Sequence, residues 1–226
     1  MYCDNGFKAI GGVNLFCASI GSTLEFNNAI LINKGGLALR APGLTVRADM
    51  SCTDGFSATG GINLFAATIG GQLWCTGAHL DAGDTYSALD APQLKVGGGL
   101  YCNMGFKAEG RVNLFGATIG STLEFDGATL TNPDGSALRA PNLAVKTDMS
   151  CTDGFTAVGA IDLAGAHIGG QLMLERTDLS SSAADLRWAD IQELIGEPSC
   201  WPAQLHLNQL TYRGLGPYLP AREPPA

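Results

Sequence analysis

Short apolar segments recur along the chain at nearly regular intervals. Each is an apolar-x-apolar triplet, and successive triplets begin 23, 26, 23, 27, 23, 26, 23 and 33 residues apart. Alternation of apolar and polar positions is typical of a β-strand with one buried side, and the Gly-rich segments between triplets predict turns. The triplets begin at Met1, Leu24, Met50, Leu73, Leu100, Leu123, Met149, Leu172 and Leu205.

A longer repeat covers two triplets. Cys3, Cys52, Cys102 and Cys151 are separated by 49, 50 and 49 residues, and each is followed four residues later by Phe. The heptapeptide Met-Ser-Cys-Thr-Asp-Gly-Phe occurs at 50–56 and again 99 residues later, which indicates tandem duplication of a four-coil block. Such self-similarity is the signature of a solenoid, in which each unit buries its apolar side against its neighbours.

These patterns predict an all-β protein, a right-handed parallel β-helix of about nine coils. At an inter-strand spacing of roughly 4.8 Å the coils form a rod on the order of 40 Å long. An α-helical fold is disfavoured because residues 1–180 lack i, i+3, i+4 apolar spacing and the chain contains 31 glycines. A left-handed hexapeptide helix is disfavoured because the 23/26 alternation does not sustain a six-residue period, whereas flat pentapeptide-like sides stay open.

The two ends of the chain differ from its middle. Residues 1–182 carry the repeats; we expect 183–216 to form a C-terminal cap with a short helix over 183–195 and a last coil, and the Pro-rich 217–226 to be disordered. The first triplet matches the one at Leu100, so the chain starts inside a coil. We therefore expect either that it is part of a longer protein or that its first coil stacks on a partner.

Composition agrees with a soluble rod. Hydrophobic residues make up 46% of the chain and charged residues 15%, and no apolar run reaches the ~18 residues that span a bilayer. The net charge of −8 disfavours unspecific binding to nucleic acid or to anionic membranes. No signal or transit sequence is recognised. We expect a cytoplasmic protein, with membrane association of a longer protein left open.

The cysteines follow the repeat. Five occupy the inward position of a triplet or its equivalent, where burial keeps a thiol protonated and inert: Cys3, Cys52, Cys75, Cys102 and Cys151. Cys17 at a turn and Cys200 near the C-terminus are the more reactive candidates. Because there is no Cys-x-x-Cys and no His at ligand spacing from a Cys, neither a metal nor another cofactor is expected.

The outward positions of the same strands hold the candidate site residues. Tyr2, Trp74 and Tyr101 are candidate binding residues, since exposed aromatic rings can stack on a ligand. Two carboxylate pairs on neighbouring coils, Glu25 with Asp49 and Glu124 with Asp148, are separated by roughly 8 Å from the strand spacing. That separation is typical of inverting glycoside hydrolysis, so the pairs are catalytic candidates, although a solvated acidic face is the simpler interpretation.

Several motifs resemble a family of bacterial repeat proteins labelled membrane-associated oxidoreductases. They are Gly-Ala-Thr-Ile-Gly-Ser-Thr-Leu at 116–123, Asp-Gly-Ala-Thr-Leu-Thr-Asn-Pro-Asp-Gly-Ser-Ala-Leu at 126–138, Ala-Pro-Asn-Leu-Ala-Val at 140–145 and Leu-Asn-Gln-Leu-Thr-Tyr at 207–212. The resemblance covers essentially the whole chain and implies an oxidoreductase at a membrane. Its motifs are repeat positions, and they carry over no catalytic residue.

The architecture also resembles pentapeptide-repeat proteins, acidic β-helices that mimic DNA and bind topoisomerases. The sequence departs from their five-residue period, because Leu114, Ile119, Leu123 and Leu130 are spaced by 5, 4 and 7 residues. The sequence thus favours a non-enzymatic β-solenoid scaffold or protein-interaction module, binding a protein partner or self-associating through its uncapped first coil. The alternatives are the family-label oxidoreductase, a carbohydrate-active β-helix and an acidic DNA mimic.

Overall fold

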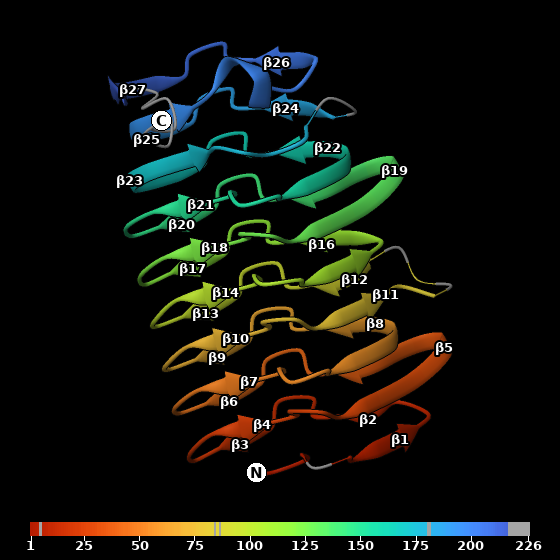
Figure 1. Ribbon diagram of the computed structural model, residues 1–226. Helices are drawn as coiled ribbons and strands as arrows, with labels where there is room; N and C mark the ends of the chain where they lie inside the picture. The colour runs from red at the N-terminus through yellow and green to blue at the C-terminus, as the bar shows by residue number, and fades with distance from the viewer. Residues whose placement is uncertain (5, 84, 86, 180–181, 217–226) are drawn as a thin grey trace, which may run out of the picture.

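The protein is a stack of about nine coils (Figure 1). The computed structural model describes residues 1–4, 6–83, 85, 87–179 and 182–216. Each coil contributes short strands that lie directly over those of the coil before, and the strand pairs are parallel, as between β10 (Leu73–Trp74) and β14 (Leu100–Tyr101). The all-β parallel β-helix predicted from the repeat is confirmed.

One sheet of 12 strands forms one side of the stack. Two long strands each pair with two strands of the preceding coil. The N-terminal end of β5 pairs with β1 and its C-terminal end with β2, and β19 pairs with β15 and β16 in the same way. The 12 strands are β1 (Lys8–Ile10), β2 (Val13–Asn14), β5 (Ile30–Arg40), β8 (Ser57–Asn63), β11 (His79–Asp81), β12 (Ser87–Asp90), β15 (Lys107–Glu109), β16 (Arg111–Asn113), β19 (Thr129–Arg139), β22 (Thr156–Asp162), β24 (Ala183–Asp185) and β26 (Gln204–His206).

A second sheet of 15 strands closes the coils. Most of its strands are only two residues long, so each contributes a short segment to the side of its coil. Besides β10 and β14, they are β3 (Ser19–Ile20), β4 (Leu24–Glu25), β6 (Thr45–Val46), β7 (Met50–Ser51), β9 (Thr68–Ile69), β13 (Lys95–Val96), β17 (Thr118–Ile119), β18 (Leu123–Glu124), β20 (Ala144–Val145), β21 (Met149–Ser150), β23 (His167–Leu174), β25 (Asp190–Gly196) and β27 (Thr211–Leu215).

The inward side chains form one continuous core along the axis of the stack. Phe26 and Phe125 are fully buried and lie 99 residues apart in the sequence. Phe26 packs on Phe56 with ring centroids 6.2 Å apart, and Phe125 packs on Phe155 at 6.1 Å. The same tilted contact in both halves agrees with duplication of a four-coil block.

Glycines at one corner of the coil allow the coils to approach each other closely. A Cβ atom on Gly70 would lie 2.2 Å from the Arg47 carbonyl oxygen, and one on Gly97 would lie 2.2 Å from the Gly70 carbonyl oxygen. Real Cβ atoms do not come so close to a backbone oxygen, so a larger residue there forces the coils apart. Gly21 holds the equivalent corner of an earlier coil, and nothing lies within 4 Å of its Cβ position.

The short helix predicted over 183–195 is wrong. The segment forms β24 and most of β25, in register with the preceding coil through the pairs Ile161–Ala184 and Ile168–Ile191. Ser182, which directly precedes the segment and would be the N-cap of such a helix, is buried and donates a hydrogen bond to the Ala157 carbonyl oxygen at 2.6 Å. The open strand edges of the coil below outweigh the modest helix preference of this segment. The one helical turn assigned in the described residues is the 3₁₀ turn η1 (Pro198–Cys200).

The ninth triplet also lies elsewhere than predicted. Leu172 pairs with Leu194, so the strand column continues into β25 after 22 residues, whereas Leu205 lies in β26 of the other sheet and pairs with Ala184. A last coil is present, as expected, formed by β26 and β27. The predicted disordered tail at 217–226 lies outside the described residues.

Candidate functional site

One outward column of side chains runs along the stack, and we call it the ladder face. It consists of the outward residues of the column of strands from β4 to β25, together with the bridge between Tyr2 and Glu25 that extends it to the first coil. The strand register gives the central residue on successive coils as Tyr2, Glu25, Ser51, Trp74, Tyr101, Glu124, Ser150, Met173 and Ile195. The predicted outward positions of Tyr2, Trp74 and Tyr101 are therefore confirmed. The column ends at Ile195, whereas the last predicted triplet, at Leu205, places His206 in the other sheet.

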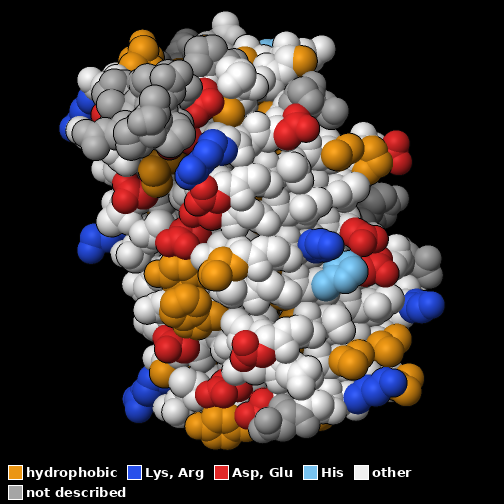
Figure 2. All heavy atoms as spheres, in the orientation of Figure 1, with side chains coloured by type: hydrophobic (Ala, Val, Ile, Leu, Met, Phe, Trp, Pro, Cys, Tyr) orange, Lys and Arg blue, Asp and Glu red, His pale blue; other side chains and the backbone are white. Residues whose placement is uncertain are grey.

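Two aromatic side chains stack at the middle of the ladder face. The rings of Trp74 and Tyr101 have centroids 4.2 Å apart and planes inclined by 13°. Figure 2 shows apolar surface at the level of β10 and β14, with acidic side chains above and below it. The Tyr101 ring lies over Gly99, whose missing Cβ would be 2.6 Å from the ring. Burial and then the Glu124 carboxylate raise the pKa of the Tyr101 phenol, which keeps it neutral.

A shallow hollow borders the indole of Trp74. Its floor is Ser51, the small residue between two larger neighbours on the column, and its polar rim holds two of the candidate catalytic carboxylates. The lining residues are Thr23, Glu25, Asn27, Asp49, Ser51 and Trp74.

The amide oxygen of Asn27 organises the wall of this hollow. It accepts hydrogen bonds from the Ser51 hydroxyl at 2.5 Å, the Thr53 hydroxyl at 2.9 Å and the Thr53 backbone N–H at 3.2 Å. These contacts join two coils and fix the position of Ser51. Analysis of the sequence alone did not single out Asn27, although its equivalent 99 residues later, Asp126, binds Ser150 and Thr152 in the same way.

The four candidate carboxylates differ in how they are held. Asp49 accepts the backbone N–H of Gln72 at 2.7 Å, and Asp148 accepts that of Gln171 at the same distance, so both connect successive coils. Glu124 accepts from the Asn103 side chain at 2.8 Å. The Glu25 carboxylate accepts two long hydrogen bonds, at 3.4 Å from Thr23 and 3.5 Å from Asn27. The pairs lie on neighbouring coils as expected, and their catalytic role stays a prediction.

The second four-coil block repeats the polar residues of this hollow but not its aromatic side chain. The residues equivalent to Glu25, Asp49 and Ser51 are Glu124, Asp148 and Ser150, but Met173 stands where Trp74 does. The strand pairs Glu124–Ser150 and Ser150–Met173 place these residues in the same order along the column. The chain thus contains a natural comparison for the role of Trp74.

The five inward cysteines are buried, as predicted, and all seven cysteines are free. Burial raises the pKa of the Cys52 thiol, and contact with the Cys75 thiol followed by burial raises that of Cys102. Cys17 is exposed, as expected. Cys200, which was also expected to be reactive, is buried: it lies in η1, and its Sγ accepts a hydrogen bond from the Thr177 backbone N–H at 3.4 Å. In the described residues no group of three or more His, Cys, Asp and Glu side chains is placed to hold a metal ion.

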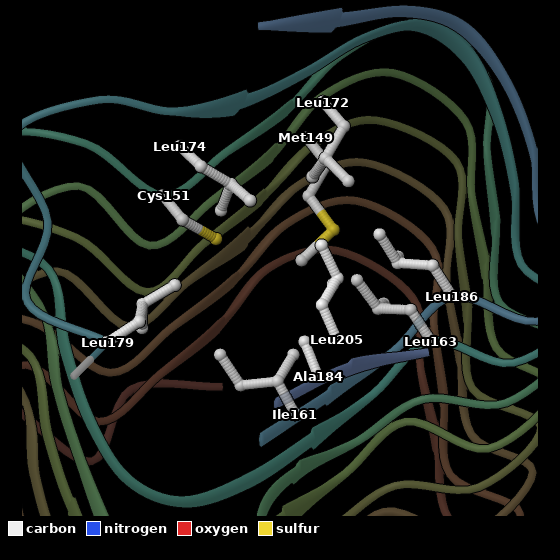
Figure 3. Close-up of a pocket in the computed structure, with 10 residues that line it drawn as sticks. All are labelled: Met149, Cys151, Ile161, Leu163, Leu172, Leu174, Leu179, Ala184, Leu186 and Leu205. Carbon is white, nitrogen blue, oxygen red and sulfur yellow. The ribbon is translucent and has the colours of Figure 1, made fainter. Parts of the chain in front are cut away.

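A small apolar cavity lies inside the stack near its C-terminal end. Figure 3 shows side chains from the last coils pointing into it, with the Cys151 sulfur on one side and no charged group among them. Its lining is wholly hydrophobic, so the cavity offers no group that would orient a polar substrate. It is lined by Met149, Cys151, Ile161, Leu163, Leu172, Leu174, Leu179, Ala184, Leu186 and Leu205.

The first coil exposes apolar side chains at the N-terminal end of the stack. Tyr2 is 69% exposed, Ile10 82% and Phe16 55%, while the inward Phe7 and Ile20 are only partly buried. Strands β1 and β3 each pair with one neighbour, at the edges of their sheets. Unpaired strand edges next to apolar side chains favour association with another chain.

Comparison of the chain with protein-family models, with curated proteins and with solved structures finds no match. The resemblances to the membrane-associated oxidoreductases and to the pentapeptide-repeat proteins therefore rest on sequence motifs and on the solenoid architecture. No helix among the described residues is long and apolar enough to cross a membrane.

Proposed function

We propose that this β-solenoid is a non-enzymatic scaffold that binds a protein partner on its ladder face. The supporting observation is the half-buried, stacked pair of Trp74 and Tyr101 at the centre of the face, next to a hollow with a polar rim. Aromatic side chains dominate the energetics of many interfaces because they bury a large area at low conformational cost.

The condition of the candidate carboxylates supports the same proposal. Asp49 and Asp148 each accept a hydrogen bond from a backbone N–H of the next coil, and these bonds connect neighbouring coils of the stack. General acid catalysis is favoured in a site that excludes water, whereas Glu25 and Asp49 line a shallow, open hollow. A flat, rigid face repeated over several coils is suited to binding an extended partner.

A carbohydrate-binding surface is the second candidate. An indole bordering a hollow lined by hydroxyl, amide and carboxylate groups also fits a sugar ring. If this surface also hydrolyses glycosidic bonds, the pairs Glu25 with Asp49 and Glu124 with Asp148 would carry the reaction.

A binding and turnover panel separates the two functions. The full chain is titrated with fluorescent peptides of basic, acidic and uncharged composition, and incubated with oligosaccharides while released reducing ends are measured. Peptide binding that is lost in a Trp74→Ala, Tyr101→Ala double variant supports the proposal. Phe65→Ala, which removes an exposed aromatic ring elsewhere on the stack, is the matched control. Failure of every peptide class, together with sugar cleavage lost in Glu25→Gln and Glu124→Gln, would refute it.

A further inference from the structure

The ladder face is acidic around the hollow. The outward residues on and beside β4, β7, β10, β14, β18 and β21 include no Lys, Arg or His. The acidic residues on and beside the whole face are Asp4, Glu25, Asp49, Glu124, Asp126, Asp148, Glu175, Glu193 and Glu197. Cationic residues lie at its borders: Arg47 and Lys146 precede Asp49 and Asp148 at the corner of the coil, and Arg176 follows Glu175 and pairs with Asp153. The partner that complements this face is therefore positively charged.

The hollow beside Trp74 is suited to one cationic side chain in particular. It combines an aromatic ring, whose neighbour in the column on that side is the small Ser51, with two carboxylates, Glu25 and Asp49. A guanidinium group stacks on an aromatic ring and donates several hydrogen bonds in its own plane, which a compact ammonium cannot do. Because both contacts of Glu25 are long, its carboxylate has capacity for a stronger donor.

We propose that the ladder face binds an extended, arginine-containing segment of a protein partner, with one guanidinium seated between Trp74 and the carboxylates of Glu25 and Asp49. This inference rests on the proposed binding function and adds the chemistry of the partner. The segment lies along the axis of the stack, crossing the coils, and its backbone stays outside the hollow.

The spacing of the acidic pairs sets the spacing of the cations. The Glu25 and Asp49 pair is followed by the Glu124 and Asp148 pair four coils later, roughly 19 Å at the inter-strand spacing. An extended peptide rises roughly 3.3 Å per residue, so cationic residues about six positions apart reach both pairs. A third arginine midway would lie at the Trp74 and Tyr101 stack.

The probe is a labelled peptide, acetyl-Arg-Ser-Ser-Arg-Ser-Ser-Arg-amide, titrated against the full chain and followed by fluorescence anisotropy. A matched peptide with citrulline at the three arginine positions keeps the shape and removes the charge. We expect the arginine peptide to bind at least about tenfold more tightly than the citrulline peptide. We also expect its affinity to fall as the salt concentration is raised about tenfold, from 50 to 500 mM, because salt screens exposed charge pairs.

Variants taken from the chain itself locate the site. Trp74→Met introduces the residue that the second block has at the equivalent position, Met173. It should weaken binding about threefold to tenfold, in line with the loss of a cation–π contact. Met173→Trp should strengthen binding by creating a second aromatic wall. Glu25→Gln should weaken binding, whereas Glu109→Gln, which removes one exposed negative charge from the other sheet, should leave the affinity unchanged.

Three results would overturn the inference. They are equal binding of the arginine and citrulline peptides, unchanged affinity in both Trp74→Met and Glu25→Gln, or binding of neutral oligosaccharides with none of the arginine peptide. Binding of an acidic or uncharged peptide through Trp74 would refute the arginine assignment and leave the scaffold proposal intact. Sugar cleavage with no peptide binding would refute both, so the two failures are distinguishable.

Discussion

Replacement of Phe125 tests the inward and outward register of the solenoid. Phe125 is fully buried and packs on Phe155, while its neighbour Glu124 points to the opposite side of the same strand. If the register is correct, Phe125→Ala is strongly destabilising and Glu124→Ala is not.

The magnitude follows from the burial of each side chain. A buried Phe removes about 150–250 Å² from water, worth about 4–6 kcal/mol at 25 cal/mol per Å². Since Ala retains part of that area and the coils collapse only partly into the cavity, we expect a loss of about 3–5 kcal/mol. Glu124→Ala removes the hydrogen bond from Asn103, a net effect of about 0.5–1.5 kcal/mol at a partly exposed site.

The measurement is a guanidinium unfolding titration of the two variants and the parent chain, followed by far-UV circular dichroism. Phe26→Ala is the matched second site, because Phe26 is buried in the same way against Phe56. Equal losses in Phe125→Ala and Glu124→Ala would show that the register is wrong. A loss below about 1 kcal/mol in Phe125→Ala would show that this part of the core is loosely packed.

Three further predictions follow from contacts described above. In native alkylation Cys17 should react and Cys102 should not, because burial keeps Cys102 protonated; mass spectrometry of the labelled peptides checks this, and rapid labelling of Cys102 would show that the column faces solvent. Gly97→Ala should cost about 1–3 kcal/mol in an unfolding titration because its Cβ meets the coil below, whereas Gly21→Ala should change stability by less than about 0.5 kcal/mol; equal effects would contradict the close approach at that corner. The chain should self-associate through its first coil, and Cys3→Lys with Phe7→Lys should shift it to monomer in size exclusion with light scattering; a parent chain that is monomeric at micromolar concentrations would contradict this.

The sequence predicts the fold well wherever the repeat is regular. The triplets at Leu24, Leu73 and Leu123 give the strand column and its inward and outward sides, because two-residue alternation leaves little choice of register. The same repeat predicts the outward position of Trp74 and Tyr101. It does not predict that their rings stack, which depends on Gly99 leaving space for Tyr101.

The prediction fails where the repeat spacing changes. Leu194 follows Leu172 after 22 residues, but Gly196 takes the third position of its triplet. The apolar pattern therefore points to Leu205 instead and favours a helix for the segment between. Its buried pairs, Ala184 with Leu186 and Ala189 with Ile191, show the two-residue alternation of strands. Cys200 was misjudged for a related reason, because an irregular segment can still pack against the last coils.

The structural role of Asn27 is indicated by the 99-residue repeat, which places Asp126 at the equivalent position. Asn27 and Asp126 hold the same position 99 residues apart, and each accepts hydrogen bonds from a Ser and a Thr on the next coil. Comparison of the two blocks residue by residue identifies them as a pair of side-chain acceptors between coils. Such contacts are invisible in the apolar pattern, which reports the core and not the polar wall around it.

The direction of the backbone hydrogen bonds has a mechanical consequence. They connect one coil to the next, as between Cys102 and Glu124 or Phe125 and Ser150, and so run along the axis of the stack. Tension applied between the two ends of the stack breaks the hydrogen bonds of one terminal coil at a time, so the coils detach in sequence. Each released coil of 23 to 27 residues adds roughly 75–95 Å of extended chain. The solenoid would lengthen under load in steps of alternating size, set by the same 23/26 alternation that defines its coils.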